Sequence, residues 1–116
     1  FRLLETYLPG PYTFILPVKK KLPKALGKRQ SIGIRVPRHL GICALINALG
    51  QPLASASLHH DDVIRDYTTD PGEIEQEWGS VIDLFLDSGF GGNGPSTVVD
   101  LCESSPKIIR QGIGNF

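Results

Sequence analysis

The stretch SIGIRVPRHLGICALINALGQPLASAS, residues 31–57, decides the fold that we expect for this chain. Ser31–Arg35 alternates apolar and polar side chains, as a half-buried strand does. Over Leu40–Leu49 apolar residues recur at helical spacing, and a glycine and a proline follow directly as a stop signal. Leu53–Ser57 then returns to a short extended run. The stretch therefore predicts a strand, a helix and a second strand.

A strand–helix–strand unit of this kind normally sets its two strands side by side and parallel, with the helix on one face of the sheet. The carboxyl ends of such strands meet at one rim, where open α/β sheets bind their ligands. We therefore expect Ser31–Arg35 and Leu53–Ser57 to be neighbouring parallel strands. This topology would bring Arg35, Ser55 and Ser57 to the same rim.

The flanking sequence adds further strands and short helices to this unit. Apolar or β-branched runs predict the strands, and turn signals or an acidic first turn mark the helices. The strands are expected at Tyr12–Pro17, Val81–Asp87, Thr97–Leu101 and Lys107–Arg110, and the helices at Arg2–Leu8 and Pro71–Trp78. With 116 residues, 41% of them hydrophobic, the chain is one α/β domain or part of one.

Composition argues against several classes of protein. The chain has no run of about 18 apolar residues and no basic segment followed by an apolar one, so neither a membrane span nor a secretory signal is visible. Cys43 and Cys102 make neither a disulfide framework nor a metal-ligand spacing. A reducing compartment is expected, the cytoplasm first and an organelle as the alternative. The chain contains no methionine and begins with phenylalanine, so we expect a fragment or a processed product.

Charge is balanced overall but unevenly placed. Nine of the 12 lysine and arginine residues lie at or before Arg38, and nine of the 12 acidic residues fall between Asp61 and Asp87. A solvated surface is one interpretation, and a basic surface for phosphate backbones is the other. The residues that would form the basic surface are Lys19, Lys20, Lys21, Lys24, Lys28 and Arg29.

Three local motifs are better explained by turns and loops than by a cofactor, metal or catalytic site. Gly89–Gly94 matches G-x-G-x-x-G, but the dinucleotide fingerprint requires a helix at its third glycine, and a strand is expected here. The residues from His59 to Asp62 could supply metal ligands, yet adjacent residues rarely point at one ion. Ser57 with His59 suggests a nucleophile and a base, without the G-x-S-x-G elbow of hydrolases. We expect no metal site.

Arginine and serine residues recur where predicted strands begin or end. Arg35 and Arg110 carry planar guanidinium groups, which suit carboxylates and phosphates. Ser55, Ser57 and Ser96 could each cap a turn. Together the five residues offer hydroxyl donors and two cations without a nucleophile, a clear base or a metal cage. Such a set binds and orients a nucleotide more readily than it performs covalent catalysis.

Five blocks, in this order and spacing, resemble the YrdC-like family, whose members include L-threonylcarbamoyladenylate synthases. The blocks are LPGPYTFIL (Leu8–Leu16), SIGIRVP (Ser31–Pro37), PLASAS (Pro52–Ser57), GPSTVVDL (Gly94–Leu101) and IIRQG (Ile108–Gly112). The resemblance covers nearly the whole chain and is closest to the YciO-like branch. It implies an α/β fold with a twisted, mostly parallel open sheet and flanking helices. Residues 1–116 would form the C-terminal part of a single such domain, incomplete at the N-terminus.

The resemblance also implies an activity. Synthases of this family combine L-threonine, bicarbonate and ATP into threonylcarbamoyl-AMP with release of pyrophosphate, the first step of threonylcarbamoyladenosine formation in tRNA. ATP is a substrate, and Mg²⁺ would be carried by the nucleotide. Family members are also described as double-stranded RNA binders, and the basic residues named above would serve that role. Carried over by motif, Ser31, Ser57, Ser96 and Arg110 would bind ATP, and Arg35 and Ser55 would bind threonine.

Three functions stay open on the sequence alone. The first is a threonylcarbamoyl-AMP synthase, which is a nucleotidyltransferase. The second is a YciO-like RNA- or nucleotide-binding module without that activity, since the synthase pattern T-S-A-N is replaced here by Ala56–His59. The third is a domain of a carbamoyltransferase that contains the same fold. The family's upstream K-x-R motif, which grips phosphates, has no counterpart in this sequence, so we expect the chain alone to be inactive in synthesis.

Overall fold

The computed structural model describes residues 2–19, 21–58, 69–92 and 94–116. In chain order the elements are α1 (Arg2–Tyr7), β1 (Tyr12–Pro17), the 3₁₀ turn η1 (Lys24–Leu26), β2 (Ser31–Ile34), α2 (Leu40–Leu49), α3 (Pro71–Trp78), β3 (Thr97–Asp100) and β4 (Lys107–Arg110). The chain divides into two compact units. The first unit is Phe1–Leu53 with Pro95–Phe116, and the second is Ala54–Gly94.

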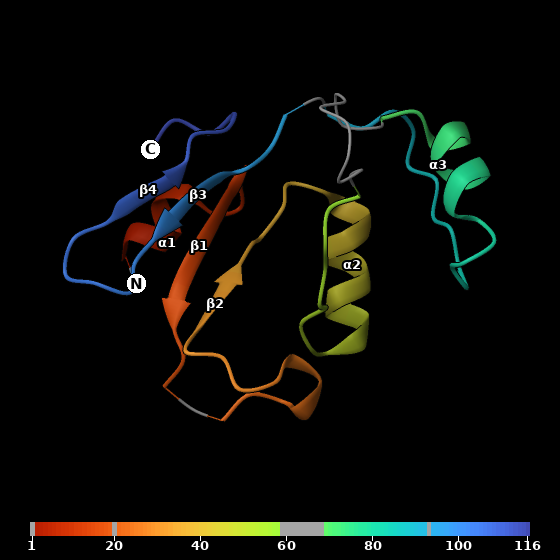
Figure 1. Cartoon of the computed structure of the whole chain (residues 1–116). Helices are drawn as coiled ribbons and strands as arrows, with labels where there is room; N and C mark the ends of the chain where they lie inside the picture. Colours follow the sequence, from red (N-terminus) through yellow and green to blue (C-terminus); the bar gives the residue numbers. More distant parts are fainter. Residues whose placement is uncertain (1, 20, 59–68, 93) are drawn as a thin grey trace. The chain divides into compact units, whose positions relative to one another are not determined.

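The first unit is built on a four-stranded sheet in the order β2-β1-β3-β4 (Figure 1). The central strands β1 and β3 are parallel, although they lie far apart in the sequence, and both outer strands run antiparallel to their neighbours. The expected α/β class is confirmed. The sheet is mixed, with one parallel pairing between two antiparallel ones.

The expected pairing of Ser31–Arg35 with Leu53–Ser57 is wrong. Within the described chain, residues 53–57 form no strand, and β2 pairs antiparallel with β1, which places Ile34 opposite Phe14. The strand that pairs with β2, β1, is rich in aromatic and branched side chains, which pack well across strands. Leu53–Ser57 is mostly alanine and serine and offers little apolar surface for such packing. The helix between the two runs, α2, is confirmed.

Val81–Asp87 is also not a strand, contrary to expectation. The segment is a turn followed by irregular backbone, and Val81 and Leu84 are 72% and 73% exposed. A strand needs a neighbour for its hydrogen bonds, and the second unit offers no strand among its described residues. Helix α3 of this unit is confirmed, with Asp70 accepting a hydrogen bond from the Gly72 N–H at 2.8 Å.

The core of the first unit lies on one face of the sheet. Phe14 from β1 and Val99 from β3 are fully buried. Tyr7 from α1, Tyr12 and Phe116 surround Phe14, with ring centroids 6.0–6.3 Å from that of Phe14. Aromatic rings at such separations add attraction beyond the area that they bury. Helix α1 and the end of the chain therefore cover this face of the sheet.

A clasp of hydrogen bonds holds the C-terminal tail on the start of β3. The fully buried Thr97 hydroxyl donates to the Gly114 carbonyl at 2.6 Å and accepts from the Gly112 N–H at 2.9 Å. Any side chain at position 112 would collide with the carbonyl groups of Pro95 and Ser96. Only glycine allows the tail to approach this closely, so the clasp fixes the backbone that leads out of β4.

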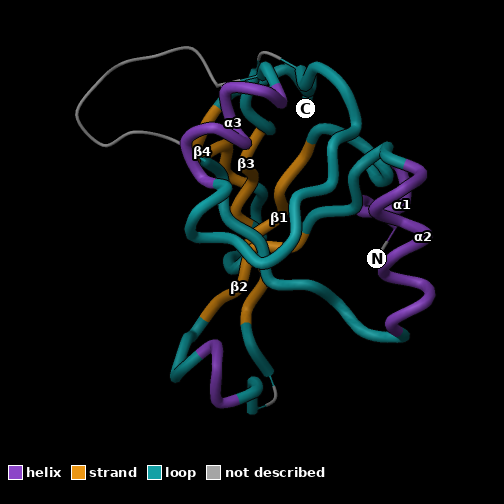
Figure 2. The backbone as a smooth tube through the Cα atoms, turned by 90° about the vertical axis from the view of Figure 1, so that its right-hand side faces the viewer, coloured by secondary structure: helices purple, strands orange, loops and turns teal. Residues whose placement is uncertain are grey.

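The connection between β1 and β2 extends well beyond the sheet, as Figure 2 shows. It carries η1 and ends where Ser31 begins β2. In the part of the chain that the structure describes, no helix is both long and apolar enough to span a bilayer.

Candidate functional site

The face of the sheet opposite Phe14 carries polar residues from all of its strands. Successive side chains of a strand point to opposite faces, so Thr13 and Ile15 lie on this second face. Gly33 pairs with Ile15 and therefore shares it. A Cβ atom on Gly33 would lie 3.3 Å from Thr13 Cγ2, which confirms the arrangement. We call this the polar face.

Ser96 is the centre of a hydrogen-bonded cluster on the polar face. Its Oγ lies 2.8 Å from Thr13 Oγ1. The Arg110 guanidinium donates to the Ser96 carbonyl from Nε and Nη2, at 3.2 and 3.0 Å, and Nη2 also lies 3.3 Å from Ser96 Oγ. Ser96 is only 8% exposed. Both the hydroxyl of Ser96 and the guanidinium of Arg110 are therefore held in defined positions.

A β-bulge in β4 determines the direction of Arg110. Ile108 pairs with Val99, and Arg110 pairs with Val98, so one extra residue, Ile109, lies between two adjacent partners. Regular alternation from Ile108 would turn Arg110 toward the covered face. The extra residue reverses the side. Arg110 thereby reaches the hydroxyl cluster on the polar face.

Arg35 directly follows β2, whose last residue, Ile34, pairs with Phe14. Alternation along the strand predicts the Arg35 side chain on the polar face. The backbone after β2 is tied to the start of β1, because the Gly10 N–H donates to the Val36 carbonyl at 2.9 Å. In the strand order, β2, which Arg35 follows, and β4, which carries Arg110, lie on opposite sides of the two strands β1 and β3 that bring Thr13 and Ser96 together. Two cations around two hydroxyls are suited to an anion.

Ser31 lies at the opposite end of the polar face. It pairs with Pro17, whereas Ser96 precedes the residue that pairs with Tyr12. Ser96 is therefore level with Pro11, and six residues separate the two positions, or roughly 20 Å at about 3.3 Å a residue. Ser31 and Ser96 therefore cannot contact the same small group. A ligand that reaches both must be elongated along the strands.

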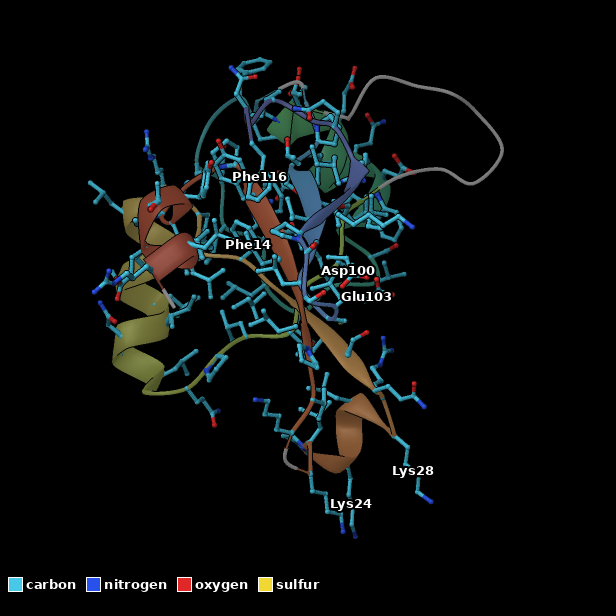
Figure 3. All side chains as sticks on the ribbon, turned by 90° about the vertical axis from the view of Figure 1, so that its left-hand side faces the viewer. Phe14, Lys24, Lys28, Asp100, Glu103 and Phe116 are labelled. Atoms are coloured by element: carbon cyan, nitrogen blue, oxygen red, sulfur yellow. The ribbon has the colours of Figure 1, made fainter. Side chains whose placement is uncertain are left out.

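The Ser31 end of the polar face is acidic. The pKa of the Asp100 carboxyl is lowered chiefly by hydrogen bonds from the side chain and the backbone N–H of Cys102, and to a smaller degree by the charge of Lys107. Its hydrogen bond to Asp100 raises the pKa of the Cys102 thiol, with smaller contributions from desolvation and from the charges of Asp100 and Glu103. Ser31 also hydrogen-bonds this thiol. Figure 3 shows Asp100 and Glu103 close to one another, at a distance from Lys24 and Lys28.

The remaining serines of the predicted site belong to the second unit. Ser55 and Ser57 are exposed there, in irregular backbone. His59, which stands at the asparagine position of the T-S-A-N pattern, lies outside the described residues, as does the segment from His59 to Asp62 that was considered for metal binding. In the described residues, no three histidine, cysteine or acidic side chains gather as a metal site.

A basic pocket lies in the connection between β1 and β2. It has a volume of about 610 Å³, and none of the described residues that line it carries a carboxylate. The four cations of its lining are Lys21, Lys24, Lys28 and Arg29. The Arg29 Nε donates to the Leu26 carbonyl at 2.9 Å, which helps to fix the turn. Lys19 is exposed, and Lys20 lies outside the described residues.

Comparison with known proteins identifies the group to which these features belong. The family model Sua5_yciO_yrdC, described as "Telomere recombination", matches residues 1–112. The chain belongs to the Sua5/YciO/YrdC family. A protein of Haemophilus influenzae is 42% identical over 117 residues, which cover 99% of this chain and 56% of that protein.

Two solved structures of the Sua5/YciO/YrdC family share the fold. The crystal structure of E. coli YciO is 39% identical, with a TM-score of 0.88 over 99% of this chain and 56% of that one. P. abyssi Sua5 complexed with L-threonine is 26% identical, with a TM-score of 0.80 over 96% of this chain and 33% of that one. The chain thus spans about half the length of the bacterial relatives that it matches.

Sequence reasoning missed several residues of this face. Thr13 is the one polar residue inside the apolar run YTFIL, and that interruption on alternate spacing could have marked it. Asp100 and Cys102 carry no comparable signal. The interaction of Cys102 with Ser31 depends on where β3 ends relative to β2, and these two strands are not neighbours in the sheet.

Proposed function

We propose that this chain binds ATP and L-threonine on the polar face and serves a family synthase that joins them with bicarbonate into threonylcarbamoyl-AMP for tRNA modification. The observation that supports this most strongly is the cluster in which Arg110 bonds Ser96 beside the Thr13 hydroxyl, with Arg35 following the neighbouring strand β2. The P. abyssi Sua5 structure with L-threonine adds support from a relative of the same fold. The free cysteines suit the cytoplasm.

Each residue of the proposed site has a chemical task. Arg35 pairs with the threonine carboxylate, for which its planar fork is suited. Ser96 and Arg110 bind the nucleotide phosphates, with Mg²⁺ carried by the nucleotide. This arrangement holds a carboxylated threonine in line with the α-phosphate and neutralises the charge that develops there.

The charge of the polar face supports one orientation of the nucleotide. The phosphates belong at the cationic end, near Arg35 and Arg110. Ser31 lies roughly 20 Å from Ser96, at the end of the face that carries Asp100, where ribose or base donors are favoured over a phosphate. Ser31 then contacts the nucleoside part of ATP.

Binding measurements test this function directly. Calorimetric titration with L-threonine should give saturable binding, and Arg35→Lys should weaken it about tenfold, because lysine cannot make the bidentate contact. Arg2→Lys, an exposed substitution on α1, is the matched control and should bind as the parent does. Equal affinities of the parent and of Arg35→Lys for L-threonine would refute the proposal that Arg35 binds the threonine carboxylate.

Pyrophosphate release distinguishes the synthase from its alternative. A YciO-like module would bind the nucleotide without turnover when ATP, threonine and bicarbonate are supplied together. A synthase would release pyrophosphate only when all three are present. The assay is best run on this chain and on a longer protein that restores the length of its relatives. Binding without turnover in both would favour the YciO-like alternative.

We propose RNA binding as a second function, at the β1–β2 connection. The support is the pocket of about 610 Å³ lined by Lys21, Lys24, Lys28 and Arg29. Lys24 and Lys28 project away from the sheet (Figure 3), where a phosphate backbone has free access. Lys19 and Lys20 extend the basic sequence on one side. The partner would be tRNA or another double-stranded RNA.

Salt dependence tests this second function. Each phosphate neutralised in a duplex contributes about 0.9 to the slope of log K against log salt. Replacing Lys24 and Lys28 by alanine should lower the slope by nearly two of these increments. Lys107→Ala removes a lysine outside the connection and serves as the control. A slope that is the same in the double variant and in the parent would assign the connection to ordinary solvation.

A further inference from the structure

The hydroxyls of Thr13 and Ser96, at the centre of the polar face, share one hydrogen bond, and either of them can be its donor. A serine hydroxyl offers one donor and two acceptor lone pairs. Arg110 Nη2 can only donate, so it uses one lone pair of Ser96 Oγ, at 3.3 Å. The Thr13 hydroxyl, 2.8 Å from the same atom, can either donate or accept. The choice that Thr13 makes decides what Ser96 has left to offer a ligand.

The charge around the pair selects between these two directions. If Ser96 donates to Thr13, its remaining lone pair requires a ligand that donates. If Thr13 donates, both lone pairs of Ser96 are filled, and its O–H is left for a ligand that accepts. Arg110, which bonds Ser96, and Arg35, which follows β2, favour an anion, and carboxylate and phosphate oxygens accept hydrogen bonds. The arrangement in which Thr13 donates to Ser96 therefore agrees with that charge.

We propose that Thr13 is a positioning residue, which donates its hydroxyl hydrogen to Ser96 Oγ and thereby turns the Ser96 O–H toward an anionic oxygen of the ligand. This inference rests on the proposed function, because that function places a carboxylate or a phosphate between the two guanidinium groups. Thr13 acts through Ser96 and needs no contact with the ligand.

The surroundings of Thr13 fix the position of its hydroxyl oxygen beside Ser96. Its Cγ2 methyl lies on the β2 side, where a Cβ on Gly33 would approach within 3.3 Å, and its Oγ1 lies on the β3 side against Ser96. β-Branched side chains are stiff about χ1. The methyl toward Gly33 and the hydroxyl toward Ser96 therefore define one rotamer. Serine at position 13 would keep the donor but lose the methyl that restrains it.

The test compares anionic ligands with neutral counterparts in Thr13 variants. The probes are ATP against adenosine, and L-threonine against L-threoninamide, which lacks the carboxylate. Thr13→Val keeps the shape but removes the donor, and it should weaken binding of at least one anionic probe about tenfold. Affinity for the matching neutral probe should not change. Thr13→Ser should recover most of the lost affinity. The probe that responds identifies the anion, carboxylate or phosphate.

A double-mutant cycle separates positioning from general loss of structure. In a Ser96→Ala background the hydroxyl that Thr13 directs is absent, so adding Thr13→Val should cause no further loss of affinity. A further loss there, or equal losses for anionic and neutral probes, would overturn the positioning role. Unchanged binding of both anions by Thr13→Val would overturn it while leaving the proposed function intact. Failure of the parent to bind either anion would overturn both.

Discussion

Thr97→Val should destabilise the first unit by removing one oxygen from a site that no water reaches. Valine has the shape of threonine, so the change leaves packing nearly intact and isolates the hydrogen bonds. Thr97 is fully buried, and its hydroxyl donates to the Gly114 carbonyl at 2.6 Å and accepts from the Gly112 N–H at 2.9 Å. The Gly114 carbonyl keeps a second donor, Gln111 Nε2 at 2.7 Å. The Gly112 N–H loses its side-chain partner.

The expected decrease in the free energy of unfolding follows from these hydrogen bonds. One unpaired, partly buried N–H costs about 1–3 kcal/mol, and the lost bond to the carbonyl is worth about 1 kcal/mol or less where another donor remains. We therefore expect a decrease of about 2 kcal/mol in the free energy of unfolding, which is a large share of the roughly 5–15 kcal/mol typical of a domain. The melting temperature should fall by about 8 °C.

Urea unfolding followed by circular dichroism measures the effect of Thr97→Val. Thr6→Val is the matched control, because the Thr6 hydroxyl is exposed and bonds only the Arg2 carbonyl of its own helix, at 3.1 Å. The control should change the free energy of unfolding by no more than about 0.5 kcal/mol. If Thr97→Val matched the control, the clasp would contribute little, and the tail would be held by the Phe116 ring instead.

Three further predictions concern the clasp and the acidic end of the polar face. Gly112→Ala should cost about 3 kcal/mol or more in urea unfolding, because its side chain would collide with backbone, while Gly92→Ala, with open space around it, should cost little. Asp100→Asn should lower the pKa of the Cys102 thiol, so that in a Cys43→Ser background iodoacetamide alkylation at pH 8 becomes faster; an unchanged rate would contradict the hydrogen bond. Because the pKa of Asp100 is lowered in the folded chain, its stabilisation is present above the ordinary carboxyl pKa and is lost on acidification. Because the pKa of Cys102 is raised, its stabilisation is present at neutral pH and is lost as the pH rises through the alkaline range. Titrations of stability against pH measure both effects.

The strands of the first unit could be predicted from the sequence, but their partners could not. Tyr12–Pro17 and Lys107–Arg110 have the expected bounds because local side-chain pattern determines extended backbone. Pairing depends on which surfaces fit together over long sequence separations. The parallel partner of β1 is β3, which begins 85 residues after β1 begins, at Thr97 against Tyr12. The strand–helix–strand pattern at residues 31–57 predicted the helix correctly and the neighbour of β2 wrongly.

The same limit applies to the candidate site. Alternation along β2 places Arg35 on the polar face from sequence alone. Alternation along β4 would have placed Arg110 on the covered face, and only the bulge at Ile109 reverses it. No residue type in KIIR marks that bulge. The side-chain bonds from Arg110 to Ser96 are the observation that reveals it.

The two ends of the polar face together restrict what can fill it. A free amino acid is too short to reach from Ser96 to Ser31 across roughly 20 Å, and inorganic phosphate would use only the cationic end. Asp100 makes the other end unfavourable for a second anion. A ligand that fills the whole face must therefore be long, anionic at one end and rich in donors at the other. The adenylate that we propose as the product, joined through its phosphate to a carboxylated amino acid, has that distribution of charge and donors.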